Sequence, residues 1–302
     1  MNYYLPEGRL IHTAQNQRYL AGLDALAEAM ERRVILEAEA VRCDSARNLH
    51  VRLGGGISGV IPRSETALGL DDGTTREIAV LCRVGRPVCF RVAGLEANNG
   101  RLTPILSRRM AQQEALSALR QIPPGAVIPA TVTRLESFGA FVDVGCGLTS
   151  MIPIERISVS RITHPDRRFT VGQEIYAVYQ GIDPDSGHIL LSHRELLGTW
   201  AENAARFAPG ETVTGTVRGI QEYGVFVELT PNLTGLAEAF PGLEEDQRVS
   251  VYLKAIQPER HKIKLLIIDA LETGIRAEPF DYYIPGRNAA DWQYYSPLIA
   301  SQ

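Results

Sequence analysis

The sequence FGAFVDVG at residues 138–145 returns as YGVFVELT at residues 223–230, and its surroundings return with it. Each copy follows a strand-like run, AVIPATVTRL in the first case and TVTGTVRGI in the second. Each is followed by a glycine-containing segment, a spacer and a final strand-like run, HILLS or KIKLL. Phe138 and Tyr223 are 85 residues apart, as are Phe141 and Phe226. A repeat of that length, built from short strands, predicts an array of similar β-domains.

A fainter copy precedes these two. The run RNLHVRLGGGISGVIP aligns with FGAFVDVGCGLTSMIP, and Gly85 then falls on Gly172. Arg47 and His50 stand in this alignment where the second unit has its two phenylalanines, so the first unit has lost both rings. Three units are therefore predicted, at roughly 35–110, 123–196 and 208–270.

Composition favours a cytoplasmic protein. No run approaches the ~18 apolar residues of a membrane span, and MNYYLPEGRLIH lacks the pattern of a signal peptide. The four cysteines form no CxxC pair and are expected to be buried thiols in a reducing compartment. The net charge of −4 gives no overall attraction to a polyanion. A nucleic-acid partner would therefore have to be held by local patches and by stacking.

The segments between the units have helical patterns. Residues 16–33 and 107–120 each place apolar side chains on one face, and Pro123-Pro124 ends the second of them. Residues 195–207 are predicted to form another helix, before Pro209-Gly210 opens the third unit. The predicted organisation is an N-terminal helical extension (1–34), a degenerate first unit (35–110), a linker helix (111–122), the second unit (123–196), a linker helix (197–207), the third unit (208–270) and an aromatic-rich C-terminal extension (271–302).

Strand alternation predicts which rings face outward. If Val142 and Val144 point into the core, Phe141 points outward, and Phe226 does the same in the third unit. Gly139 and its counterpart Gly224 permit a bulge or bend that brings Phe138 and Tyr223 onto the same surface. About five strands in some 70 residues is the size of a small OB-type barrel, which binds single strands by stacking.

The units resemble the S1 RNA-binding domain, an OB-fold, and the whole chain resembles short ribosomal-protein-S1-like chains of Gram-positive bacteria. The resemblance lies in GAVIPATVTRLESFGAFVDVG, VGQEIYAVYQGID and ILLSHREL, and in the junction that leads into the third unit. It implies a mainly β fold, a tandem array of three OB-type barrels with helical connectors. Pro62, Pro153 and Glu238 stand where the family often has a histidine.

The resemblance also implies the RNA-binding residues. Its two aromatic positions match Phe138 and Phe141, then Tyr223 and Phe226, with Arg47 and His50 in the first unit. The family's aspartate near the last turn matches Asp183. The basic residues of the last strand and its end are His188, Arg194, Lys262, Lys264 and Arg101.

Other charged and aromatic segments leave alternatives open. Arg156, Arg161, Arg167 and Arg168 lie in one long connection, where they either contact phosphate or form an ordinary charged loop. Arg108 and Arg109 are expected to begin a solvated helix. The aromatic C-terminal extension either packs back on the third unit or is presented to a protein partner. The histidines form no HxxxH or HExxH pair, and no serine lies in a GxSxG setting.

The sequence therefore predicts a protein without catalytic residues, metal or cofactor that binds single-stranded RNA, with mRNA near the small ribosomal subunit as the expected setting. Two alternatives remain. The first is a protein-interaction scaffold, which the acidic balance and the missing histidine favour. The second is an accessory chain of RNA processing.

Overall fold

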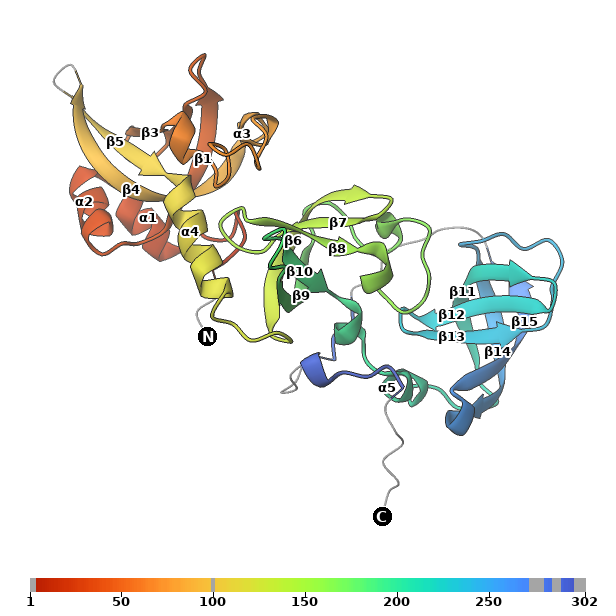
Figure 1. The fold of residues 1–302 in the computed structure, drawn as a ribbon. Coiled ribbons are helices and arrows are strands. Elements are labelled where there is room, and N and C mark those ends of the chain that lie inside the picture. Colours follow the sequence, from red (N-terminus) through yellow and green to blue (C-terminus); the bar gives the residue numbers. More distant parts are fainter. Residues whose placement is uncertain (1–3, 99–100, 272–279, 284–288, 296–302) are drawn as a thin grey trace. The chain divides into compact units, whose positions relative to one another are not determined.

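The computed structural model describes residues 4–98, 101–271, 280–283 and 289–295. Within these residues the chain forms three closed five-stranded barrels with short helices (Figure 1), which confirms the predicted mainly β fold of OB-type barrels. The chain divides into two compact units. The first unit comprises Met1–Ile122, Pro129–Thr131 and Asp143–Thr149, and the second comprises Pro123–Ile128, Val132–Val142 and Ser150–Gln302.

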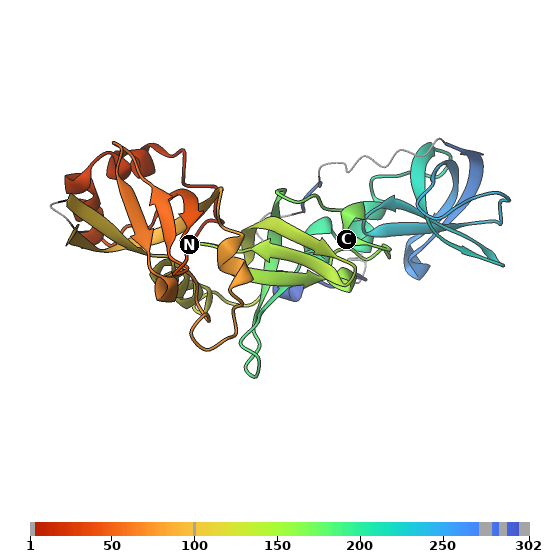
Figure 2. The same ribbon diagram turned by 90° about the horizontal axis from the view of Figure 1, so that it is seen from above.

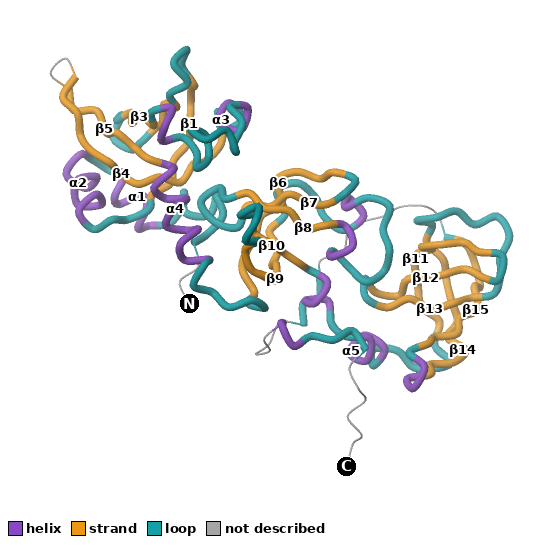
Figure 3. The backbone as a smooth tube through the Cα atoms, viewed as in Figure 1, coloured by secondary structure: helices purple, strands orange, loops and turns teal. Residues whose placement is uncertain are grey.

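The three barrels share one strand order. Their strands are drawn in orange in Figure 3. The first barrel contains β1 (Leu36–Cys43), β2 (Leu49–Arg52), β3 (Ser58–Ile61), β4 (Arg86–Asn98) and β5 (Arg101–Ser107). The second contains β6 (Val127–Glu136), β7 (Gly139–Asp143), β8 (Thr149–Pro153), β9 (Glu174–Ile182) and β10 (Ile189–Ser192). The third contains β11 (Thr212–Gln221), β12 (Gly224–Thr230), β13 (Leu233–Ala237), β14 (Arg248–Gln257) and β15 (Lys262–Ala270). In each barrel the first strand neighbours the second and fourth strands, and the third strand runs parallel to the fifth.

The strand register supports the alignment of the faint first repeat. His50 on β2 lies opposite Val60 on β3, and Val60 lies beside Ile105 on β5. In the third barrel Phe226 lies opposite Leu236 by the same pairing, and Leu236 lies beside Lys264. His50 therefore occupies the place in the first barrel that Phe226 occupies in the third.

Alternation along the strands produces each core. Val142 and Val144 are buried in the second barrel and Val227 is buried in the third, as the alternation predicts. Leu229, which the same alternation places inward, is only half-buried, and Val225 is buried instead. Ile263 and Leu265 of β15 point into the same core, where they alternate with exposed lysines. Inward side chains are removed from water while their neighbours remain outside, because successive residues of a strand point to opposite faces.

The helices differ from the predicted continuous segments. The predicted helix at 16–33 is two helices, α1 (Ala14–Leu20) and α2 (Leu23–Glu31), which are separated at Gly22. Residues 107–120 form α4 (Arg108–Leu119), as predicted, with the Ser107 side chain capping its start. Residues 195–207 instead form a 3-10 turn, η4 (Arg194–Leu197), and α5 (Trp200–Ala204), because Gly198 takes a left-handed φ of 82° and Thr199 begins the new helix with a capping box.

Short helical turns complete the connections that can be followed in Figure 2. They are α3 (Ile78–Leu81), η1 (Arg63–Glu65), η2 (Ile154–Arg156), η3 (Pro165–Arg167), η5 (Pro258–Arg260) and η6 (Ala289–Asp291). None of the helices in the described ranges is long and apolar enough to cross a membrane. Cys89 and Cys146 are buried as expected, whereas Cys43 is half-buried and Cys82 is exposed.

The described parts of the C-terminal extension pack back on the second and third barrels. The backbone N–H of Tyr283 donates to the Leu196 carbonyl at 2.8 Å, and the Phe280 ring lies 5.6 Å from that of Phe169 in the second barrel. Further along, the Tyr294 hydroxyl donates to the Asn232 carbonyl of the third barrel at 2.7 Å. The extension thus contacts the second barrel as well as the third.

Candidate nucleic-acid interface

Two pairs of aromatic rings share one geometry in the second and third barrels. The centroids of the Phe138 and Phe141 rings are 6.0 Å apart with an interplanar angle of 86°. The Tyr223 and Phe226 rings are 6.2 Å apart at 88°. Phe138 is 53% exposed and Tyr223 is 69% exposed, while Phe141 and Phe226 are half-buried. The four rings therefore lie at the surface rather than in the barrel cores.

A glycine next to each outer ring fixes this arrangement. A Cβ on Gly139 would lie 2.6 Å from the Ile152 carbonyl oxygen, and one on Gly224 would lie 2.4 Å from that of Ala237. Real Cβ atoms do not approach so closely, so only glycine lets the start of β7 or β12 lie against the neighbouring strand. Gly224 also has a φ of +152°. The predicted special role of these glycines thus arises from close backbone approach.

The ring pair of the third barrel continues across neighbouring strands into a basic edge. Leu236, which is 38% exposed, lies between Phe226 and Lys264 in the strand register. Lys262 and Lys264 are exposed, and no acidic side chain in the described residues forms an ion pair with either. An aromatic ring, a leucine and an ammonium group thus follow one another across β12, β13 and β15. A nucleotide could stack its base on the ring and place its phosphate near the ammonium group.

The second barrel has a more apolar version of this face. Leu190 lies beside Met151 in the register and is 44% exposed, at the position that Lys264 holds in the third barrel. His188 is exposed just before β10. Asp183 accepts the backbone N–H groups of Asp185 and Ser186 at 3.0 and 2.8 Å, so its carboxylate holds the β9–β10 turn.

One cation on this face was missed by the sequence reasoning. The Arg134 guanidinium lies 4.3 Å from the centroid of the Phe141 ring, close enough for a cation–π contact. Arg134 is exposed on β6, and the repeat places Gly219 at the corresponding position of the third barrel. The only available signal was an arginine on the strand preceding the ring. A positive charge therefore lies at both aromatic faces but comes from different strands.

The first barrel has ion pairs where the others have rings. The His50 ring nitrogen Nε2 lies 3.0 Å from Asp44 Oδ2 and 3.1 Å from an Arg42 guanidinium nitrogen. Arg47 lies 3.6 Å from a carboxylate oxygen of Glu77, with its backbone in the left-handed region at φ 66°. Arg101 begins β5, and its side chain lies outside the described residues. The face therefore offers no ring for stacking among its described residues.

Several arginines lie elsewhere than expected. Arg108 is buried and bonded to Glu7, with N–O distances of 2.6 and 3.0 Å, so the expectation of a solvated residue was wrong. Burial opposes ionisation of Glu7, but Arg108 and Arg83 hold its pKa below the usual value. Arg194 lies 5.9 Å from the Trp292 ring of the C-terminal extension and 3.7 Å from Glu195.

The long connection of the second barrel contains both exposed and buried arginines. Arg156 and Arg161 are exposed, whereas the Arg168 side chain is only 6% exposed and lies 2.5 Å from Glu228. Strand alternation predicts Glu228 and its repeat partner Asp143 on the outer faces beside Phe226 and Phe141, but both side chains are buried, and Arg168 and Arg218 cover Glu228. Burial, followed by the negative charge of Glu7, raises the pKa of Asp143 to about 7. Neither carboxylate adds negative charge to the exposed surface.

The described residues contain no group of three or more histidine, cysteine or acidic side chains that could hold a metal ion. His193 is buried and its pKa is lowered to about 4 by that burial. Its ring lies 5.0 Å from Phe169 and 4.8 Å from Phe280, so it belongs to an aromatic cluster beneath the C-terminal extension.

Part of this chain matches a known family. Residues 121–194 match the S1 RNA binding domain. The small ribosomal subunit protein bS1 of Staphylococcus aureus (strain COL) is 30% identical over 200 residues, which are 61% of this chain and 50% of that protein. A bS1 homologue of Bacillus cereus (strain ATCC 10987 / NRS 248) is 29% identical over 238 residues, 72% of this chain and 60% of that protein. The chain spans about half the length of the first of these relatives.

Solved structures add weaker likenesses. A multidomain protein with nucleic acid binding domains from Streptococcus pneumoniae has 13% identity and a TM-score of 0.25, covering 78% of this chain and 73% of its own. GSP13 from Bacillus subtilis has 26% identity and a TM-score of 0.23, and the match covers 30% of this chain and 62% of GSP13. TM-scores this low do not establish a shared arrangement. With its match at residues 121–194, the chain is an S1 RNA-binding domain protein that resembles bacterial bS1.

Proposed function

We propose that this chain binds single-stranded RNA on the faces of its second and third barrels, with low sequence specificity. The observation that carries the proposal is the repeated ring pair: Phe138 with Phe141, and Tyr223 with Phe226, stand edge-on at the surface with nearly equal spacing. Exposing two rings at the same strand positions twice would be costly without a partner, since water disfavours apolar surface.

The binding requires no chemical transformation. Unpaired bases stack on the rings, each contributing on the order of 1–3 kcal/mol. Lys262, Lys264 and Arg134 supply positive charge for the phosphates beside them. Stacking accepts every base, because every base has a flat face, so sequence preference is weak.

The proposed setting is mRNA at the small ribosomal subunit in the cytoplasm. Its support is the resemblance to proteins named small ribosomal subunit protein bS1, at 30% identity over half of their length. The first barrel, with ion pairs in place of rings, is proposed to serve attachment rather than stacking.

A protein-interaction scaffold is the second candidate, and the first barrel favours it. Its ion-paired face around His50 and Glu77 offers directional charges of both signs, which suit a protein surface better than a polyphosphate. The RNA proposal and this one differ in what the second and third barrels bind.

A filter-binding comparison tests the proposal with the full chain. An unstructured RNA and a perfect duplex of equal length are compared at the same low salt concentration. Stacking needs unpaired bases, so the single strand is expected to bind more tightly. Equal affinity for the two forms, or no RNA binding at all, would count against the proposal. Crosslinking in cell lysate then distinguishes the two candidate functions. Crosslinked RNA would support RNA binding, and crosslinked protein would support the scaffold.

A further inference from the structure

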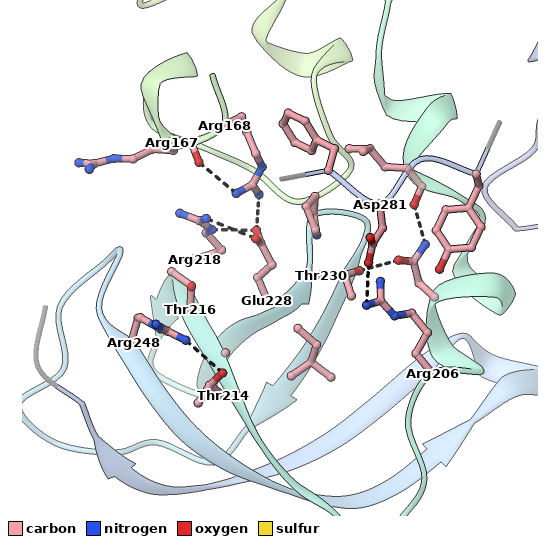
Figure 4. A pocket seen from close by; sticks show the side chains of 17 residues that line it. Arg167, Arg168, Arg206, Thr214, Thr216, Arg218, Glu228, Thr230, Arg248 and Asp281 are labelled. Atoms are coloured by element: carbon pink, nitrogen blue, oxygen red, sulfur yellow. Dashed lines mark hydrogen bonds and ion pairs between the residues drawn. The ribbon is translucent and has the colours of Figure 1, made fainter. Parts of the chain in front are cut away.

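A polar cavity of about 230 Å³ lies in the second compact unit, and none of the four paired rings lines it (Figure 4). Its walls come from the loop around η3, from the end of α5, from β11, β12 and β14, and from residues 280–283. Five arginines line it: Arg167, Arg168, Arg206, Arg218 and Arg248.

Two of these arginines build the wall. The Arg168 and Arg218 side chains are each 6% exposed, and both donate to Glu228, at 2.5 and 2.8 Å. Arg218 also pairs with Asp246. Arg218 is the extra residue of a β-bulge, since Val217 pairs with Val227 and Gly219 with Phe226. Bulges re-aim side chains, and this one turns a guanidinium toward the cavity.

Two other arginines remain available for a ligand. Arg206 lies 3.1 Å from Asp281, but these side chains are 43% and 76% exposed, so the pair is weak. Arg248 donates to the Thr214 hydroxyl at 3.2 Å and has no carboxylate partner in the described part of the chain. Five guanidinium groups meet four carboxylates here, those of Asp166, Glu228, Asp246 and Asp281. The local charge is therefore positive in a chain whose net charge is −4.

The corresponding surface of the second barrel carries its own anion. The repeat matches Glu228 with Asp143, and the backbone N–H of Glu7 donates to Asp143 at 2.8 Å. The Glu7 carboxylate beside it neutralises Arg108 at 2.6 Å and Arg83 at 3.1 Å. All four residues belong to the first compact unit. Arg206 and Arg248 of the cavity have no such buried carboxylate among the described residues.

The cavity adjoins the aromatic face along one strand. Phe226 and Glu228 are two residues apart on β12, so their side chains point to the same side of the strand and their Cα atoms are roughly 7 Å apart. A strand of RNA stacked on Phe226 would therefore pass the mouth of the cavity.

The geometry points to phosphate binding in this cavity, where Arg206 and Arg248 contact backbone phosphates of the RNA that stacks on the third barrel. Guanidinium groups bind phosphate oxygens through paired, charge-assisted hydrogen bonds, and the Thr214 and Thr216 hydroxyls line the same cavity. This inference rests on the proposed RNA binding.

The test is the double variant Arg206→Gln/Arg248→Gln in the full chain, with Arg248→Gln alone as the milder form. The control, Arg32→Gln/Arg120→Gln, removes two exposed arginines elsewhere and changes the net charge equally. Binding of a fluorescent single-stranded RNA is measured across salt concentrations, and binding of adenosine monophosphate is measured separately. Circular dichroism and the thermal midpoint verify folding.

We expect the cavity variant to bind RNA about tenfold more weakly, with a salt slope shallower by about 0.7 for each phosphate that is no longer bound. The control should match the unaltered chain. Loss of nucleotide binding with unchanged RNA binding would keep the phosphate site and assign it to free nucleotides. Unchanged binding of both ligands would overturn the inference. If Phe226→Ala still weakens RNA binding in that case, the proposed function stands without the cavity.

Discussion

The ring of Tyr223 meets the ring of Phe226 edge-on, at 88° and 6.2 Å between centroids. Two perpendicular rings cannot both lie flat against one base. Each ring therefore offers its face to a different base, and the arrangement at Phe138 and Phe141 is the same. Removing a single ring should abolish stacking of one base and leave the other bases in place.

The first prediction concerns these rings. Phe141→Ala and Phe226→Ala should each weaken binding of single-stranded RNA by about 1–3 kcal/mol, because one base can no longer stack. Neither ring is part of a buried core, so the circular dichroism spectrum should not change. Tyr252→Ala is a matched control, since Tyr252 is 37% exposed on β14, outside the row of Phe226, Leu236 and Lys264. Unfolding of either phenylalanine variant would show that the rings support the barrel instead.

The second prediction concerns salt. The slope of log K against log salt for the unaltered chain should be roughly −2 to −4, at about −0.7 per phosphate contact. Lys262→Glu/Lys264→Glu should flatten the slope and lower the affinity together, because both ammonium groups are exposed and lie at the aromatic face. Arg32→Glu/Arg120→Glu makes the same change in net charge elsewhere. If both double variants behaved alike, the effect would reflect total charge rather than the face.

The third prediction concerns the glycines beside the rings. Gly224→Ala would place a Cβ 2.4 Å from the Ala237 carbonyl oxygen, so β12 must shift. We expect a loss of roughly 1–3 kcal/mol in the free energy of unfolding, together with weaker RNA binding as the ring pair moves. Gly94→Ala is the control, because its Cβ would meet nothing within 4 Å. Urea unfolding measures both variants, and equal small losses would contradict the close approach.

The fourth prediction concerns acid. Burial lowers the pKa of His193 to about 4, below its ordinary value of about 6.5. Between these values the unfolded chain binds a proton that the folded chain does not, so stability falls as pH falls from 6.5 through 4. At pH 5 the loss should be about 2 kcal/mol relative to pH 7. In His193→Gln this component should be missing. Urea unfolding at pH 7 and pH 5 compares the two chains, and equal losses would refute a buried neutral histidine.

Much of the aromatic site could be predicted from the sequence, because its residues are close along the chain. Phe138 and Phe141 are three residues apart, and strand alternation with the special glycine between them fixed their common surface. Arg134 escaped prediction because nothing in a local pattern says which cation meets which ring.

The three barrels and the outward direction of the rings could be read from the amino-acid pattern, because a period of two along a strand and an 85-residue repeat are local and periodic properties. Which charges are exposed depends instead on how distant segments pack. Arg168 and Glu228 are 60 residues apart, and Arg108 and Glu7 are 101 apart, yet each pair is buried together. Burying a charge is favourable only when a partner compensates the lost hydration, and the folded chain supplies that partner from distant segments without a sequence pattern.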